Sequence, residues 1–183
     1  TVDQCVLVHP DCCKILRATL DYFTEHGAVF YKKMAHVGYL RHLLVRRGVK
    51  TGEILVDLVT STQTEGTWKS EQNEEALLEG WKEKLLGLDL EGSFAGILHT
   101  ENDSLADVVQ NDRTVILYGQ DFFMEELLGL KFKITPFSFF QTNSLGAEVL
   151  YETAREYIGE TDGRKVFDLY SGTGTIAQIL APA

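Results

Sequence analysis

The chain has 183 residues, of which 44% are hydrophobic and 24% charged, a composition typical of a folded globular protein with one or two small domains. It contains no apolar run of about eighteen residues and no basic-then-apolar leader, so neither a membrane span nor an export signal is expected. The formal net charge of −10 argues against strong non-specific binding of nucleic acid by the whole surface.

The three cysteines, Cys5, Cys12 and Cys13, stand near the start of the chain. They are too few and too clustered for a disulfide framework, and free thiols are typical of a reducing compartment. We therefore expect a cytoplasmic protein. The first residue is Thr1 rather than methionine, so we expect these residues to be a piece of a longer protein.

The first two thirds of the chain alternate between helical and extended patterns. A helix is predicted at 9–23, where Pro10 suits the first helical position. Two aliphatic segments joined by the glycine-containing stretch "GVKTG" predict a hairpin. The other predicted elements are a helix at 73–87 and strands at 93–101, 113–119 and 131–137. We expect residues 1–136 to form one α+β domain, a mostly antiparallel sheet with packed helices.

A local basic zone interrupts this acidic chain. Residues 26–52 contain no Asp or Glu but several Lys and Arg residues, with "VGYLRHLLVRRGVK" at their centre. One interpretation is a solvated face of two strands. The other is a surface that contacts the phosphates of RNA, with Arg41, Arg46 and Arg47 as substrate-binding residues.

The pattern changes after residue 136. A helix is predicted at 141–159, with Thr142 or Asn143 as its cap. The stretch "KVFDLY" at 165–170 is nearly all apolar, as in strands buried within a parallel sheet. A glycine-rich loop, "SGTG", follows it and leads into the start of another helix.

This loop fits the pattern G-x-G-x-x-G/A between a strand and a helix, from Gly172 to Ala177. Gly172 permits a tight turn with positive φ, and Gly174 lets a ligand approach the backbone. The start of the helix offers unpaired N–H groups. Many glycine turns bind nothing, so a simple turn stays open as an alternative.

The carboxylate of Asp168 sharpens the prediction of the ligand. It would repel a pyrophosphate that lay over the loop, but it would attract an ammonium and, less directly, a sulfonium group. S-adenosylmethionine carries both cations. The electrostatics therefore favour S-adenosylmethionine over a dinucleotide.

Two stretches, "FKITPFSFFQTNSLGAEVLY" and "VFDLYSGTGTIAQILA", closely resemble the RNA (uracil-5-)-methyltransferases. These enzymes use S-adenosylmethionine to make 5-methyluridine in rRNA or tRNA. The resemblance implies an RNA-binding barrel, a central α+β domain and a class I methyltransferase domain in the parent. Residues 1–136 would be the central domain, and residues 137–183 the incomplete start of the Rossmann-like α/β methyltransferase domain.

The resemblance also implies roles for single residues. Gln141 matches a glutamine near the cofactor and the target base, whose amide suits the O4/N3–H edge of uracil. Phe139 matches the aromatic residue beside it. Tyr170, Gly172 and Gly174 match the cofactor loop, with Asp168 as a further cofactor-binding residue.

Cys5 matches the last of four cysteines that hold a 4Fe–4S cluster in many members. A cluster needs four thiolates placed together, and the other three would precede Thr1. Cys12 and Cys13 are neighbours on a helix and diverge by about 100°. A cluster is therefore expected only in a full-length parent.

By resemblance, the parent flips a uridine out of RNA, adds a cysteine thiolate to C6, methylates C5 and removes the C5 proton with a glutamate. Both catalytic groups would lie beyond Ala183, so we expect no catalytic residue, no activity and weak cofactor binding in this chain. The strand at 165–170 would expose an apolar edge, which predicts a homodimer through it.

Three functions are weighed. The first is a fragment of an RNA uracil-5 methyltransferase, acting on rRNA rather than tRNA. The second is a non-catalytic RNA-binding or regulatory module. The third is a methyltransferase that acts on another substrate.

Overall fold

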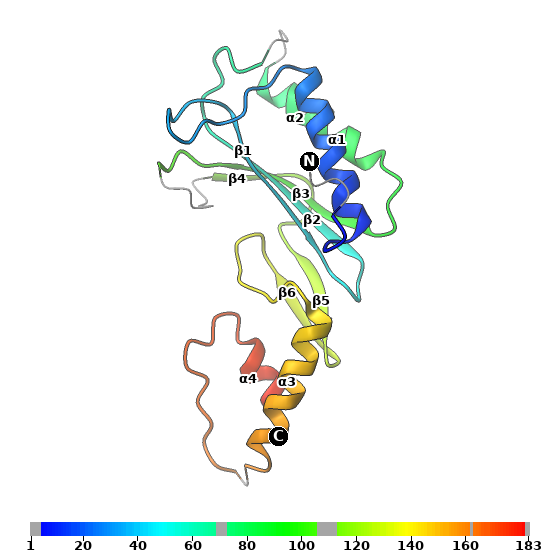
Figure 1. Ribbon diagram of the computed structural model, residues 1–183, viewed down its shortest axis with the longest axis vertical. Coiled ribbons are helices and arrows are strands. Elements are labelled where there is room, and N and C mark those ends of the chain that lie inside the picture. Colours follow the sequence, from blue (N-terminus) through cyan, green and yellow to red (C-terminus); the bar gives the residue numbers. More distant parts are fainter. Residues whose placement is uncertain (1–4, 69–72, 106–112, 162, 182–183) are drawn as a thin grey trace.

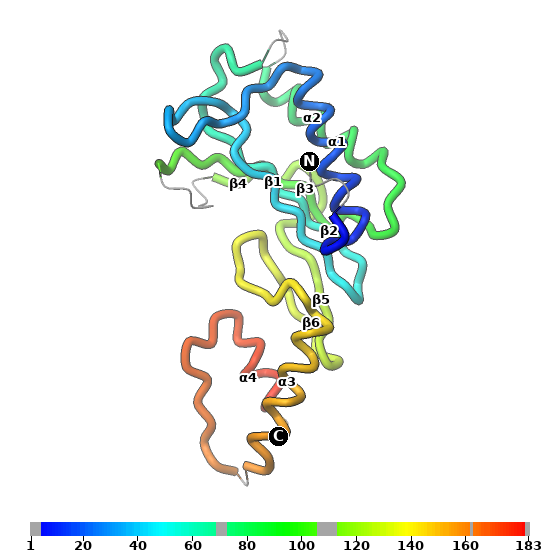
Figure 2. The backbone as a smooth tube through the Cα atoms, in the orientation of Figure 1, coloured from blue at the N-terminus to red at the C-terminus, as the bar shows by residue number. Residues whose placement is uncertain are grey.

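The computed structural model describes residues 5–68, 73–105, 113–161 and 163–181 (Figure 1). The molecule is elongated. One part holds a four-stranded sheet with α1 and α2, and the other holds a two-stranded hairpin with α3 and α4. Figure 2 shows the chain passing from the sheet into the hairpin and then into α3.

The sheet has the strand order β1-β2-β3-β4. β1 pairs with β2 and β3 with β4 in antiparallel register, whereas β2 and β3 run parallel. The parallel pair arises because α2 lies between these two strands in the chain and serves as the crossover. The strands are β1 (Leu40–Arg47), β2 (Glu53–Thr60), β3 (Ser93–Glu101) and β4 (Arg113–Gly119).

The helices α1 (Pro10–Glu25) and α2 (Glu74–Leu86) cover one face of the sheet. Pro10 occupies the start of α1, as predicted, and Asn73 caps α2 by accepting the N–H of Ala76. Trp81 is fully buried between the helices, and its Nε1 donates to Thr19 Oγ1 at 3.0 Å. The Tyr22 hydroxyl donates to the carbonyl oxygen of Leu77 at 2.9 Å, so buried hydrogen bonds as well as packing join the two helices on this face.

A second hydrophobic cluster lies on the opposite face of the sheet. There Leu55 and Leu98 of the sheet pack with side chains from the hairpin and from α3 and α4. The hairpin turns through Leu128 and Gly129, both at positive φ. Its elements and the helices beyond are β5 (Phe123–Leu127), β6 (Leu130–Ile134), α3 (Ser144–Ile158) and α4 (Thr175–Leu180).

Several sequence-based expectations are confirmed. The helices and four sheet strands stand at the predicted places, two of the three sheet pairings are antiparallel, and Asn143 caps α3. The strand β5 was not predicted. The boundary after residue 136 stays a prediction, and the second cluster draws residues from both sides of it.

The strand predicted at 165–170 is wrong. Residues 165–168 have no regular secondary structure, and residues 169–170 form a turn. A parallel strand takes its hydrogen bonds from neighbouring strands, and within the described part of the chain no strand lies beside this segment. Its apolar side chains are exposed instead: Val166, Phe167, Leu169 and Tyr170.

A search of the described residues finds no helix that is both long and apolar enough to cross a membrane.

Candidate functional site

A cleft of about 730 Å³ lies where the sheet meets the hairpin and α3. Its wall combines the end of β1, the segment before α1 and the start of α3. Three residues predicted from the sequence line it together, namely Gln141, Arg46 and Arg47. The fold thus joins the amide predicted to read the base with two of the arginines predicted to contact RNA.

Arg46 holds the backbone of the segment that leads to Gln141. Its Nη1 lies 2.7 Å from the carbonyl oxygen of Thr135, 3.0 Å from that of Pro136 and 2.7 Å from that of Ser138. The guanidinium also lies 5.7 Å from the centre of the Phe123 ring. Burial lowers the pKa of Arg46 below its ordinary value. Its charge is therefore directed at the protein's own backbone.

Phe139 and Gln141 are the two residues of this segment whose side chains are accessible to a ligand. The Phe139 side chain is 74% exposed, whereas its neighbour Phe140 is buried against Phe132, with ring centres 5.9 Å apart. Gln141 is half-buried, and its side chain forms no hydrogen bond with another described residue. Its amide is therefore available to a ligand in the cleft.

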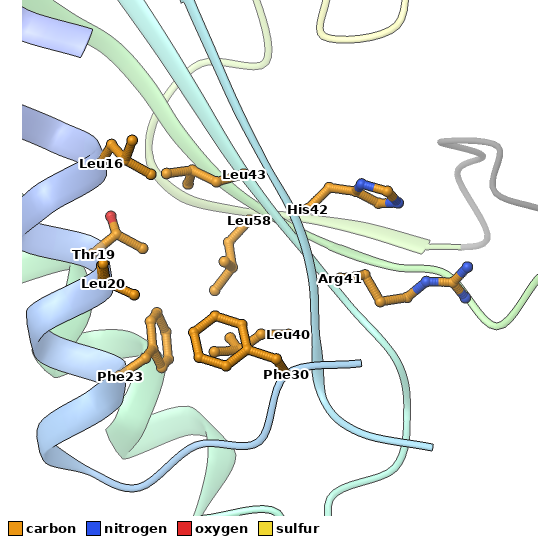
Figure 3. Close-up of a pocket in the computed structure, with 10 residues that line it drawn as sticks. All are labelled: Leu16, Thr19, Leu20, Phe23, Phe30, Leu40, Arg41, His42, Leu43 and Leu58. Carbon is orange, nitrogen blue, oxygen red and sulfur yellow. The ribbon is translucent and has the colours of Figure 1, made fainter. Parts of the chain in front are cut away.

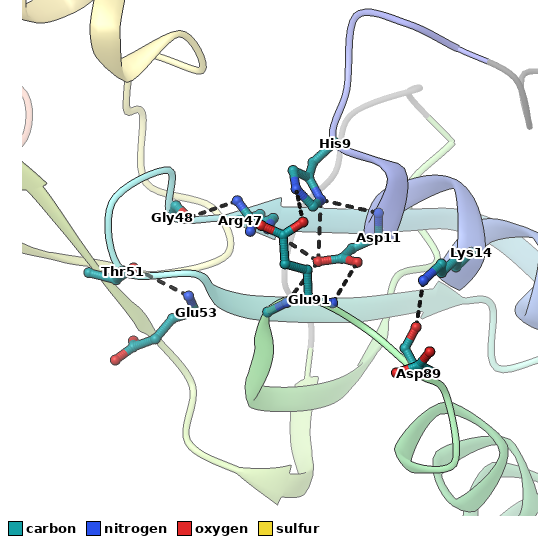
Figure 4. A network of polar contacts seen from close by, with 10 residues as sticks. His9, Asp11, Lys14, Arg47, Gly48, Thr51, Glu53, Asp89 and Glu91 are labelled. Carbon is teal, nitrogen blue, oxygen red and sulfur yellow. Dashed lines mark hydrogen bonds and ion pairs between the residues drawn. The ribbon is translucent and has the colours of Figure 1, made fainter.

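Arg47 belongs to a polar network around Asp11, drawn in Figure 4. Asp11 Oδ2 lies 3.3 Å from Arg47 Nε, and the carboxylate accepts the N–H groups of Glu91 and Gly92. Burial by itself raises the pKa of Asp11. The hydrogen bonds from the backbone N–H groups of Gly92 and Glu91, and the nearby charges of His9 and Arg47, outweigh burial and lower the pKa of Asp11 below its usual value. The network ties the start of α1 to β1 and to the loop before β3.

Arg41 stands apart from the cleft. It donates to the carbonyl oxygens of Asn102 and Ser104, at 2.6 and 2.8 Å, and lies 4.3 Å from the centre of the Tyr31 ring. In Figure 3, Arg41 and His42 extend from β1 away from the side where Leu16, Leu20 and Phe23 of α1 meet the strand. That side encloses a small cavity of about 220 Å³ with a mostly aliphatic and aromatic lining. RNA contact by the three arginines stays a prediction.

The predicted cofactor loop leads into α4. Gly172 adopts positive φ, 54°, as the sequence predicts. Gly174, at 70°, and the fully exposed Tyr170 also have positive φ. The Asp168 carboxylate accepts the N–H of Ala177 at 3.1 Å, so it caps the first turn of α4. It lines a separate cavity of about 380 Å³ between the end of α3, the segment 161–169 that precedes the loop, and α4.

These residues fit part of an S-adenosylmethionine site. The two glycines leave space beside the backbone, since a Cβ built on Gly172 or Gly174 would meet no atom closer than 3.6 Å. Asp168 could face the cations of the cofactor with its carboxylate, although one oxygen already binds Ala177. Gln141 and Asp168 line different cavities, so the described residues do not bring the predicted cofactor set into one site.

Cys5 is half-buried at the start of the described chain, where its carbonyl oxygen lies 3.8 Å from Cys13 Sγ. In the described ranges, no group of three or more His, Cys, Asp or Glu residues is placed to hold a metal ion. The sequence has three cysteines in all. A cluster with four cysteine ligands cannot be completed from these residues.

Glu125 is a site residue that sequence reasoning missed. Its buried carboxylate accepts from Val49 N, Lys50 N and Ser144 Oγ, at 2.6, 3.1 and 2.8 Å, and it lines the cleft. It lies on the same buried face of β5 as Phe123 and Leu127, two residues from each. The acidic pair "EE" at 125–126 was the available signal.

Comparison with known proteins was made at three levels. No protein-family profile matches the chain. A Clostridium tetani protein named as an uncharacterized RNA methyltransferase is 51% identical over 182 residues, which is 100% of this chain and 38% of that protein. A Caldanaerobacter subterraneus subsp. tengcongensis protein with the same kind of name is 44% identical over 180 residues, 98% of this chain and 38% of that protein.

Among solved structures, the chain is similar to the Pyrococcus abyssi tRNA (uracil-54, C5)-methyltransferase in complex with S-adenosyl-L-homocysteine. The TM-score is 0.65 with 27% identity, over 94% of this chain and 37% of that one. The resemblance to RNA methyltransferases inferred from the sequence is thereby confirmed, as is the mixed α/β fold. The chain spans less than two fifths of the length of these relatives.

Proposed function

We propose that these residues form part of an enzyme that transfers a methyl group from S-adenosylmethionine to C5 of a uridine in RNA. The observation that carries this proposal is similarity along the whole chain to proteins named RNA methyltransferases, together with a tRNA uracil-C5 methyltransferase among the solved structures. The elements S-F-F-Q-T-N and D-L-Y-S-G-T-G-T support the same chemistry.

Within this proposal, Gln141 and Phe139 take the target base. The exposed Phe139 ring offers an apolar face on which a flipped base can stack, and the free Gln141 amide can both donate and accept. Uracil presents one acceptor, O4, beside one donor, N3–H, so one amide can bind both.

The glycine loop supplies the cofactor part. Gly172, Gly174 and Tyr170 would line the S-adenosylmethionine site, with Asp168 near the cations. When bound, the cofactor supplies the methyl group. We propose that residues 137–183 are the start of a Rossmann-like methyltransferase domain and that residues 1–136 are a central domain. In that arrangement, later strands would pair with 165–170.

The 183 residues by themselves are proposed to be inactive and to bind the cofactor weakly. Two features support this. The 183 residues span 37–38% of the length of the relatives. The glycine loop stands beside no strand in the part of the chain that the structure describes. We further propose that Cys5 is one of four cluster ligands in the longer protein, and that the exposed residues 165–170 could pair two copies of the isolated chain.

The deciding experiment uses the longer protein that carries this sequence. It would be incubated with S-adenosylmethionine and with RNA tritiated at C5 of uridine, rRNA and tRNA separately. Methyl transfer to C5 displaces that tritium into water, and nucleoside analysis would show 5-methyluridine. We expect tritium release with rRNA. Methylation without tritium release would contradict the uridine-C5 proposal, and methylation of tRNA alone would reassign the RNA.

A variant with Gln141 replaced tests whether this residue contributes to methyl transfer. Gln141→Leu has nearly the same volume but no amide, so we expect tritium release to fall by about 100-fold or more. The matched control is Arg113→Lys, because Arg113 is exposed on β4 and pairs with Glu101 far from the cleft. Equal rates for Gln141→Leu and wild type would remove Gln141 from the site.

A further inference from the structure

The segment 135–144 carries Phe139 and Gln141, and both of its ends are fixed by charged side chains. At the first end, the single atom Arg46 Nη1 lies within 3.0 Å of three backbone carbonyl oxygens. Hydrogen bonds between Ser138 Oγ and the Thr135 backbone close the same turn. The chain direction into Phe139 is therefore set by a charge-assisted contact.

At the second end, Ser144 Oγ donates to Glu125 Oε2 at 2.8 Å. Glu125 is 1% exposed, and backbone N–H groups of Val49, Lys50 and Glu126 also donate to it. A buried carboxylate with four donors is held firmly, since each lost donor would leave a buried charge less compensated.

Between the ends, contacts are sparse. Phe140 and Pro136 are buried, but Phe139, Thr142 and Asn143 are exposed and the Gln141 side chain has no partner among the described residues. The two fixed ends and the buried Phe140 together therefore decide where Gln141 points. Both ends are held from one corner of the sheet, because Arg46 is the residue before the last of β1 and Val49 and Lys50 lie in the turn that follows.

We infer that Arg46 and Glu125 are positioning residues that clamp segment 135–144 at both ends and so hold Gln141 in the wall of the cleft, and the exposed Phe139 before it, in one orientation. This inference rests on the proposed uridine methylation for its effect on catalysis. The clamp itself rests on the contacts above.

Arginine and lysine differ at the first end in how the nitrogen is positioned. The rigid, planar guanidinium places one nitrogen, Nη1, among the three carbonyl oxygens while the group lies 5.7 Å from the centre of the Phe123 ring. A lysine keeps the charge but offers a compact ammonium on a flexible stem. Arg46→Lys should therefore loosen the segment without changing the net charge that RNA meets.

The first measurement is amide hydrogen exchange on the 183-residue chain. We expect exchange at Thr135 and Ser138, whose N–H groups are hydrogen-bonded within the turn, to be about tenfold faster in Arg46→Lys than in wild type, with the four-stranded sheet unchanged. Ser144→Ala releases only the second end and should instead speed exchange at Val49 and Lys50, whose N–H groups donate to Glu125. Arg113→Lys is the control and should change nothing. Unaltered exchange at these four amides in both clamp variants would overturn the inference.

The second measurement is the tritium-release assay in the longer protein. Small misplacements of a positioned group can cost up to about 100-fold in rate, so we expect kcat to fall about 10- to 100-fold in Arg46→Lys. The KM for RNA and its salt dependence should stay as in wild type. A raised KM with unchanged kcat would instead assign Arg46 to phosphate contact and overturn the positioning role. A wild-type enzyme that releases no tritium would refute the proposed function. The hydrogen-exchange experiment needs no activity, so it would still test whether Arg46 and Glu125 hold the segment.

Discussion

Arg46 Nη1 and the carbonyl oxygen of Ser138 lie 2.7 Å apart although 92 positions separate the two residues in the chain. A few residues further on, the backbone N–H of Val49 meets the Glu125 carboxylate at 2.6 Å. One corner of the sheet thus carries the hairpin, the segment to Gln141 and the start of α3. The candidate site is built across the joint between the two parts of the molecule.

The two adjacent phenylalanines should behave in opposite ways. Phe140 is 8% exposed and Phe139 is 74% exposed. Phe140→Ala should lower the free energy of unfolding by about 3 kcal/mol, because it leaves a cavity in the second cluster. Phe139→Ala should change it by less than about 0.5 kcal/mol and should lower methyl transfer instead. Urea denaturation and the tritium assay measure the two effects, and a comparable loss of stability in both variants would contradict the assignment.

Asp57 should make the protein less stable as the pH rises. The carboxyl is 1% exposed, and burial raises its pKa to about 6, partly opposed by a hydrogen bond from Thr100. A raised pKa means that the folded state holds the proton more tightly, so stability falls between about pH 4 and pH 6 and is then constant. The lost stability amounts to about 2 to 3 kcal/mol at neutral pH.

The test for this carboxyl is Asp57→Asn, compared with wild type by urea denaturation at pH 4 and pH 8. We expect the variant to be more stable at pH 8 and to lose that advantage at pH 4. The comparison cancels the opposite contribution of His99, whose pKa is lowered to about 4 by burial. A difference that is the same at both pH values would show that Asp57 ionises normally.

Asp11 should have the opposite effect. Burial alone would raise its pKa, but the N–H groups of Gly92 and Glu91, with His9 and Arg47, lower it. Its stabilising contribution is then complete above the unfolded value near pH 4 and is lost as the pH falls through the lowered folded value. Asp11→Asn should cost about 2 kcal/mol at pH 7.

Asp21 provides the matched control for Asp11, because it stands on the same helix with an exposed carboxylate 3.8 Å from Arg17. Asp21→Asn should change stability by about 0.5 kcal/mol or less. Thermal melts between pH 3 and pH 7 measure both variants. An Asp11 variant as stable as the Asp21 variant at pH 7 would contradict the network in Figure 4.

Gly96 should tolerate no side chain. A Cβ there would lie 1.8 Å from the carbonyl oxygen of Gln120 and 2.9 Å from Leu55 Cδ1, near the start of β3 and opposite Gly119 at the end of β4. Gly96→Ala should therefore destabilise the sheet by about 1 to 3 kcal/mol. In Gly87→Ala the new carbon would meet its nearest atom at 3.6 Å, so this variant should stay close to wild type. Chemical denaturation of both variants checks the comparison.

Much of the secondary structure could be predicted because local signals were strong. Pro10 and Asn143 stand at the starts of helices, and glycines separate β1 from β2. β5 was missed because "FMEEL" places acidic residues where a buried strand is expected to be apolar. Its Glu125 is buried because Val49, Lys50 and Ser144 satisfy it, and these partners are distant in sequence.

At 165–170 the error is the opposite one, because a strand was predicted where the structure has none. The composition of this segment favours a strand, but a parallel strand exists only with partners, and none of the described strands provides them. The sequence likewise predicted Arg46 as a surface residue of a basic zone. In the folded chain its guanidinium is half-buried against backbone carbonyls.

The sequence by itself determined the helix starts, the hairpin of β1 and β2, the positive φ of Gly172 and the resemblance to RNA methyltransferases. These depend on residues close together in the chain or on whole motifs. The tertiary structure decided the partners of Arg46, Glu125 and Asp11, and with them the orientation of Gln141. Such contacts join residues up to 92 positions apart. The packing of the hairpin against the sheet brings Arg46 and Glu125 to their partners, and the packing of α1 against the sheet does the same for Asp11.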